Sequence, residues 1–140
     1  MSESDNLPEV LAAIERVKQQ ILNQVDATAV EVSQRLEQKA KRIVSVDRDT
    51  QPYPAISGEP PMKVTGNLRR NIKGDVKRHG FGIYVAEVGS YMIYARALEL
   101  GGAPTWVRGQ KFPYLQPALE QFQKSNSIRR IFAKNIRKAL

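Results

Sequence analysis

A single apolar stripe runs along the first third of the chain and constrains its fold more than any other feature. Apolar residues recur at steps of three and four from Leu7 to Ile43, a spacing typical of one face of an amphipathic helix. Pro8 stands where a first-turn proline is tolerated. At ~1.5 Å per residue the helix is roughly 50 Å long, more than the diameter of a small domain. We therefore expect residues 1–43 to form a helix that either bends or breaks near Thr28 or Ser33, or projects onto a neighbouring molecule.

The helical pattern ends in a proline-rich stretch at residues 44–62. Four prolines and one glycine within it exclude a regular helix or a central strand. A loop of this length is uncommon inside a compact domain, and such loops often become ordered only against a partner. We expect this loop to become ordered on a neighbouring subunit.

Residues 63–120 predict a series of short elements. Thr65 can cap a helical turn, and strand-like runs follow at about 72–77 and 81–88, with a glycine-containing turn between them. Helical spacing returns at 91–100 and stops at two glycines, the first of which is Gly101. Another helical piece begins at Pro117.

The last segment, residues 121–140, predicts a basic amphipathic helix after an interruption at residues 125–127. One face is apolar, and the basic residues of the segment are candidates for contact with DNA or with another subunit. These residues are Lys124, Arg129, Arg130, Lys134, Arg137 and Lys138. Because the apolar face is narrow and lacks tryptophan, we expect the helix to pack on its own domain rather than on a membrane.

Charge is divided unevenly along the chain. Residues 1–62 carry seven Lys or Arg against ten Asp or Glu, whereas residues 63–140 carry fifteen against four, for a total net charge of +8. This asymmetry indicates contact with a polyanion, for which nucleic acid is the usual candidate. A basic surface that aids solubility or meets an acidic neighbouring subunit explains it equally well.

Residues suited to catalysis are scarce. The chain has no cysteine and a single histidine, His79, which excludes thiolate chemistry and a zinc cluster of the usual kind. There is no phosphate-binding glycine loop. Glu87 and Glu99 are better explained as ion-pair partners of nearby arginines than as an acid–base pair. We therefore expect neither an enzyme nor a cofactor, and no apolar run approaches the ~20 residues that span a membrane.

Three motifs between residues 62 and 119 resemble a known family. They are Thr65-Gly66-x-Leu68-Arg69, then Tyr94-Ala95-x-x-Leu98-Glu99-x-Gly101, then Phe112-Pro113-Tyr114-Leu115-x-Pro117-Ala118-Leu119. In this order they resemble the tail-completion and head–tail joining proteins of tailed bacteriophages of the lambdoid type. From the residues alone, we expect most motif positions to maintain the fold. Glu99, an acid at a helix end, is a candidate for a fixed ion pair.

The resemblance implies an α+β fold in which a small antiparallel sheet packs against helices. It also implies a virion structural protein that forms a homo-oligomeric ring in the neck or at the tail top. Its partners would be further copies of itself and the neighbouring connector and tail proteins, with packaged DNA passing through the ring. The alternative is a sequence-independent nucleic-acid-binding protein that acts through the basic C-terminal half.

Overall fold

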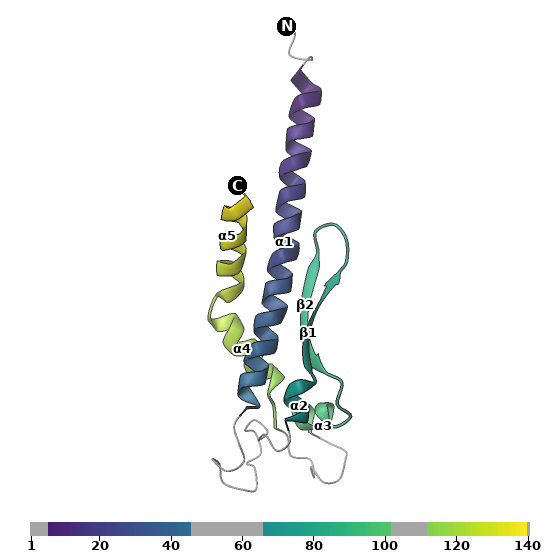
Figure 1. Ribbon diagram of the computed structural model, residues 1–140, viewed down its shortest axis with the longest axis vertical. Helices are drawn as coiled ribbons and strands as arrows, with labels where there is room; N and C mark the ends of the chain where they lie inside the picture. Colours follow the sequence, from purple (N-terminus) through teal and green to yellow (C-terminus); the bar gives the residue numbers. More distant parts are fainter. Residues whose placement is uncertain (1–5, 46–65, 102–111, 140) are drawn as a thin grey trace.

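The computed structural model describes residues 6–45, 66–101 and 112–139, and these form an elongated α+β molecule built along one helix (Figure 1). Most of the predicted proline-rich loop lies outside the described residues, as do Thr65 and the loop that contains Trp106. Within the described residues the elements are five helices and one antiparallel hairpin, which confirms the predicted fold class.

The helix α1 spans Leu7–Ile43 without interruption, so the predicted long helix is confirmed. Its 37 residues extend over about 55 Å at ~1.5 Å per residue. The break considered at Thr28 or Ser33 does not occur. Both residues stay within the helix, where their hydroxyls donate hydrogen bonds to the carbonyl oxygens of Gln24 and Val30. Projection beyond the domain is the outcome that the structure supports.

A short helix, α2 (Asn67–Arg70), leads into the hairpin of β1 (Ile72–Arg78) and β2 (Tyr84–Ser90). The strands pair antiparallel, with Ile72 opposite Ser90 and Arg78 opposite Tyr84. The second strand begins three residues later than the predicted 81–88. Gly80, Phe81 and Gly82 all have positive φ and form the turn instead, so the apolar Phe81 belongs to the turn and not to the strand.

The hairpin lies against α1 at Gly74 and at its tip. A Cβ atom on Gly74 would lie 2.3 Å from the carbonyl oxygen of Ser33, so only glycine allows β1 to approach the helix this closely. The Gly74 N–H donates a 2.8 Å hydrogen bond to the Glu37 carboxylate. Near the tip, the Arg78 Nε lies 2.7 Å from the Asp26 carboxylate. The hairpin therefore follows the C-terminal half of α1.

Three further helices complete the chain: α3 (Ala95–Leu100), α4 (Leu115–Lys124) and α5 (Ser127–Ala139). The predicted helix at 91–100 begins only at Ala95. The helix expected to open at Pro117 begins two residues earlier, at Leu115. The predicted interruption between the last two helices is confirmed, because Asn126 adopts a left-handed conformation with φ +54°.

The hairpin and the α4–α5 pair lie on opposite sides of α1 (Figure 1). Two clusters of buried side chains hold these layers together. The lower cluster contains Ala40, Val44, Ile72, Leu98, Tyr114 and Ala118. The upper cluster contains Val32, Leu36, Phe122 and Ile131. The C-terminal helix thus packs on its own domain, as its narrow apolar face predicted.

Candidate assembly surfaces

The N-terminal half of α1 stands outside the body of the molecule. Side chains from residue 6 to residue 21 are exposed, apart from a half-buried Ala13, and this part of α1 extends past α5 and the hairpin (Figure 1). Its apolar side chains follow helical spacing and therefore share one face. This face, the ridge, consists of Leu7, Val10, Leu11, Ile14, Val17 and Ile21, each at least 38% exposed. An exposed apolar face of this length indicates a contact site for another molecule.

The same face of α1 continues into an apolar groove. Val25, Ala29, Val32 and Leu36 keep the spacing of the ridge and form the floor of the groove, which has a volume of about 410 Å³. Strand β2 forms one wall, and α4 with α5 forms the other. The rim is apolar and open to solvent, because Val85, Leu119, Ile128 and Phe132 each remain between 38% and 48% exposed.

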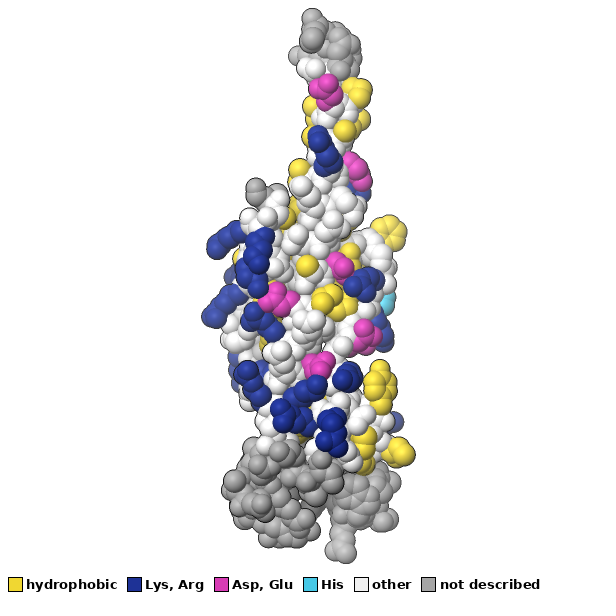
Figure 2. Space-filling view, in the orientation of Figure 1, with side chains coloured by type: hydrophobic (Ala, Val, Ile, Leu, Met, Phe, Trp, Pro, Cys, Tyr) yellow, Lys and Arg dark blue, Asp and Glu magenta, His cyan; other side chains and the backbone are white. Residues whose placement is uncertain are grey.

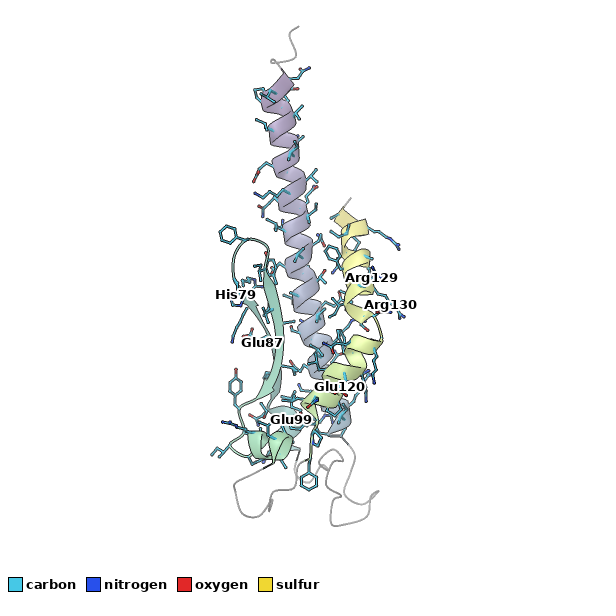
Figure 3. All side chains as sticks on the ribbon, turned by 180° about the vertical axis from the view of Figure 1, so that it is seen from behind. His79, Glu87, Glu99, Glu120, Arg129 and Arg130 are labelled. Carbon is cyan, nitrogen blue, oxygen red and sulfur yellow. The ribbon has the colours of Figure 1, made fainter. Side chains whose placement is uncertain are left out.

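A second hollow extends the groove toward the lower end of α1. It has a volume of about 730 Å³ and shares Leu36, Ala86 and Leu119 with the apolar groove. Its walls add Glu87 from the hairpin and Glu120 from α4, which Figure 3 labels on these two elements. The groove is therefore apolar beside α5 and acidic beside the start of α4.

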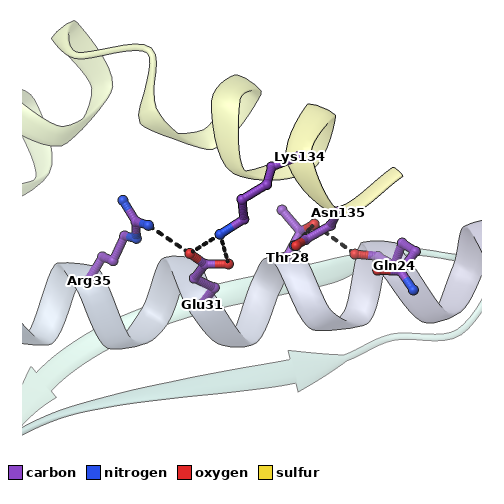
Figure 4. A network of polar contacts seen from close by, with 6 residues as sticks. All are labelled: Gln24, Thr28, Glu31, Arg35, Lys134 and Asn135. Carbon is purple, nitrogen blue, oxygen red and sulfur yellow. Dashed lines mark hydrogen bonds and ion pairs between the residues drawn. The ribbon is translucent and has the colours of Figure 1, made fainter. Parts of the chain in front are cut away.

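The predicted basic residues lie along α4 and α5. All six are exposed, and basic side chains dominate this side of the space-filling view (Figure 2). Lys134 points back to α1, where its Nζ lies 2.8 Å from the Glu31 carboxylate (Figure 4). Hydrogen bonding from Lys134 lowers the pKa of Glu31. Among the described residues, no ion pair joins Arg129, Arg130 or Arg137 to an acid, so these three are available to a partner.

Glu99 belongs to α3, and its side chain reaches the start of α4 (Figure 3). Its carboxylate accepts three backbone hydrogen bonds, from the N–H groups of Tyr114, Leu115 and Gln116, at 2.8 to 3.0 Å. These groups belong to the first turn of α4, where backbone donors lack partners within the helix and the helix dipole favours a negative charge. Sequence reasoning predicted an ion pair at Glu99. Within the described residues, the carboxylate instead caps a helix from 15 residues away.

The other predicted motif residues converge on the lower buried cluster. Leu98 and Ala118 are members of it, Leu68, Tyr94 and Leu115 pack against it, and Ala95 is buried. Gly66 and Gly101 have φ of +78° and +76°, at the start of α2 and directly after α3. Pro113 and Pro117 are half-buried on either side of the start of α4. The motifs thus build one end of the core, whereas the ridge and the groove lie outside them.

Glu87 has an ion-pair partner across the hairpin. Its carboxylate lies 3.1 Å from the Nζ of Lys77, rather than beside one of the arginines suggested by the sequence. His79 is exposed at the start of the hairpin turn, where its N–H donates to the carbonyl oxygen of Ile83. In the described part of the chain, no three His, Asp or Glu side chains are grouped as a metal site. No helix there is long and apolar enough to cross a membrane.

These features define an elongated α+β protein with a projecting apolar ridge and an open apolar groove. Residues 9–101 match the family model described as "Bacteriophage HK97-gp10, putative tail-component". The chain belongs to this HK97-gp10-like family and is accordingly a structural tail component of a bacteriophage virion, in contact with other tail proteins. The resemblance to phage tail and neck proteins is thereby confirmed. Searches of curated proteins and of solved structures returned no match.

The match extends from α1 to Gly101, so α4 and α5 lie outside it. It includes α1, which the sequence motifs did not cover, and excludes the third motif at residues 112–119. The groove wall formed by Leu119, Ile128 and Phe132 was missed from the sequence. The sequence pattern that could have indicated this wall is the four-residue spacing of Ile128 and Phe132. These two apolar residues lie on one face of α5 but are not buried against α1.

Proposed function

We propose that this tail component forms a homo-oligomeric ring in the neck or at the top of the tail, where it joins the tail to the head or completes the tail. The ridge carries this proposal. It places six large apolar side chains in solvent along one face of a projecting helix, whereas monomeric proteins seldom expose such continuous apolar surface. Membership of a phage tail-component family supports a role within the virion.

The partners of such a ring are further copies of this chain, the connector or adaptor above it and the tail proteins below it. The ring would assemble in the bacterial cytoplasm before the tail is joined to the head. The exposed basic side chains of α5 suit either the packaged DNA inside the ring or an acidic connector surface.

A nonsense mutation in the gene tests the proposed role. We expect infected cells to accumulate DNA-filled heads and separate or incomplete tails, and expression of the chain in trans should restore joined particles. Quantitative mass spectrometry of purified wild-type virions should give a whole-number copy count relative to the portal. Normal infectious particles from the nonsense mutant, or absence of the chain from virions, would reject the proposal.

A second candidate function, sequence-independent binding of nucleic acid, is favoured by the exposed basic face of α5. Residues 121–140 contain six basic residues and no acidic residue. Binding of this kind is directed at phosphates, so its affinity should fall steeply as salt is raised.

The test of this candidate compares two charge-neutralised proteins. Substitution of Arg129, Arg130 and Arg137 by glutamine should abolish binding to duplex DNA and flatten its salt dependence. The matched control neutralises Arg16, Lys39 and Arg42 on α1. Equal loss in both proteins would indicate a general effect of net charge, and unchanged DNA-filled particles with the α5 variant would show that DNA contact is not its role.

A further inference from the structure

We propose that the ridge of one copy lies in the apolar groove of the next copy, so that copies join head to tail. This inference rests on the ring of the proposed function and names the contact that closes it. A ring requires two different surfaces on each subunit, because only a contact between unlike surfaces can repeat around an axis. The ridge and the groove are two such surfaces.

The groove of a copy cannot be filled by its own ridge. Both are parts of one face of α1, and α1 is an unbroken helix from Leu7 to Ile43. A straight helix cannot fold back onto itself, so a ridge that occupies a groove must come from another molecule. The two surfaces remain uncovered in a single copy for this geometrical reason.

The lengths of the two surfaces agree. From Leu7 to Ile21 the ridge extends about 21 Å along the helix, and from Val25 to Leu36 the groove floor extends about 17 Å. The lower hollow prolongs the groove beyond Leu36. A helix laid in a groove of this kind binds through apolar residues at spacings of three and four, which the ridge supplies.

The N-terminal end of the chain and the α4–α5 wall differ in charge, although the ridge as a whole is neutral, since Glu9 and Glu15 are balanced by Arg16 and Lys18. Residues 1–15 contain four acidic residues and no basic residue, whereas residues 121–140, which contribute to the α4–α5 wall, contain six basic residues and no acidic residue. Arg129 lies beside Phe132 at the edge of this wall. Opposite charges at the rim would orient an incoming N-terminal segment toward the wall.

Pairing of two ridges is the competing arrangement. It would cover the ridges in a small bundle and leave every groove open, with Leu119, Ile128 and Phe132 still in solvent. Insertion of a ridge into a groove covers both surfaces at once and therefore buries more apolar area per copy.

Disulfide cross-linking can test this contact directly, because the chain contains no cysteine. Ile14→Cys and Phe132→Cys would be introduced together into the full chain, and purified virions carrying it would be oxidised. No cross-link can form within one copy. Asn135 of α5 contacts Thr28, and residue 14 lies about 21 Å farther along α1. We expect a ladder of covalent multimers that ends at the size of the ring.

The matched control pairs Ala12→Cys with Phe132→Cys. Ala12 is exposed on the opposite side of α1, so its thiol should not reach the groove and should give no ladder. If the chain is present in virions but the Ile14 variant forms no multimers, or forms only dimers, the head-to-tail contact is wrong while the ring can stand. Absence of the wild-type chain from virions would instead reject the proposed function.

A charge in the ridge provides an independent measurement. Ile14→Asp should raise the dissociation constant between copies roughly 100-fold or more, since it places a carboxylate in an apolar groove. The melting temperature of the monomer should not change, because Ile14 is 58% exposed in one copy. Ala12→Asp introduces the same carboxylate on the opposite face of α1, and the protein that carries it should assemble normally. Normal assembly of the Ile14 variant would overturn the inference.

Discussion

The side-chain amide of Asn135 donates a 3.0 Å hydrogen bond to the hydroxyl of Thr28, which joins α5 to α1 at a buried position (Figure 4). The Thr28 hydroxyl in turn donates a 2.7 Å bond to the Gln24 carbonyl oxygen. This short chain of bonds and the neighbouring Glu31–Lys134 ion pair attach the basic helix along the same stretch of α1.

The buried hydrogen bond should matter more than the exposed ion pair. Thr28→Val leaves the Asn135 amide buried with a lost acceptor, so we expect the free energy of unfolding to fall by about 1–3 kcal/mol. Lys134→Met removes a partly exposed ion pair and should cost less than about 1 kcal/mol. Urea denaturation of both variants measures the difference, and the reverse order would contradict the roles assigned to these contacts.

The close approach of β1 to α1 predicts intolerance of any side chain at Gly74. Gly74→Ala places a methyl group against the Ser33 carbonyl oxygen, and we expect a loss of about 2–3 kcal/mol in the free energy of unfolding. Gly89→Ala is the matched control, because nothing lies within 4 Å of a Cβ atom there. A similar loss in the two variants would mean that the close contact with the Ser33 carbonyl oxygen is not the reason why Gly74 excludes a side chain.

Removal of the Glu99 carboxylate should weaken the start of α4. Glu99→Ala leaves three backbone donors without their acceptor, which we expect to lower the free energy of unfolding by about 1–2 kcal/mol. Glu120→Ala removes an exposed acid from the same helix and should change stability by less than about 0.5 kcal/mol. Chemical denaturation distinguishes them, and a neutral Glu99 variant would exclude the capping role.

The buried phenol of Tyr114 should make the folded protein less stable at high pH. Burial raises the pKa of Tyr114 to about 12, above the ordinary value of 10.0, and the buried hydroxyl has no hydrogen-bond partner within the described residues. Well below pH 10 the phenol is neutral in both the folded and the unfolded chain. Between about pH 10 and 12 it ionises more readily in the unfolded chain, so the free energy of unfolding should decrease as pH rises.

Denaturation curves recorded from pH 9 to pH 12 measure this decrease. Tyr114→Phe should flatten it, because the titrating group is gone. Tyr91→Phe, at an 85% exposed position, should leave it unchanged. An unchanged slope in the Tyr114 variant would mean that another group controls the alkaline transition.

The elements that were predictable are those determined by local sequence. The repeated spacing from Leu7 to Ile43 sufficed for α1, and the glycines around Phe81 sufficed for a turn. The limits of β2 were misplaced because an apolar aromatic residue favours a strand, whereas the conformation of the turn decides where pairing begins.

The assembly surfaces were predictable only in part, for a physical reason. The ridge is visible in the sequence, but its exposure depends on where α5 and the hairpin end along α1. The groove brings together Val25, Val85 and Phe132 from three distant segments, and no local pattern indicates their meeting. The role of Glu99 likewise depends on a backbone turn that lies beyond Gly101.

A single face of α1 is core along one half of the helix and exposed ridge along the other, and this division has a genetic consequence. Missense changes at Val32 or Leu36 should give too little folded protein and behave as recessive losses. Changes at Leu11 or Ile14 should give a folded subunit that still offers its groove but lacks its own ridge. Such a subunit would join a growing ring and block the addition of further copies. A small fraction of it should therefore lower the yield of infectious phage in a mixed infection. Dominant changes should thus lie on the N-terminal side of Leu22 and recessive changes on its C-terminal side, because the hairpin tip first meets the helix at Leu22.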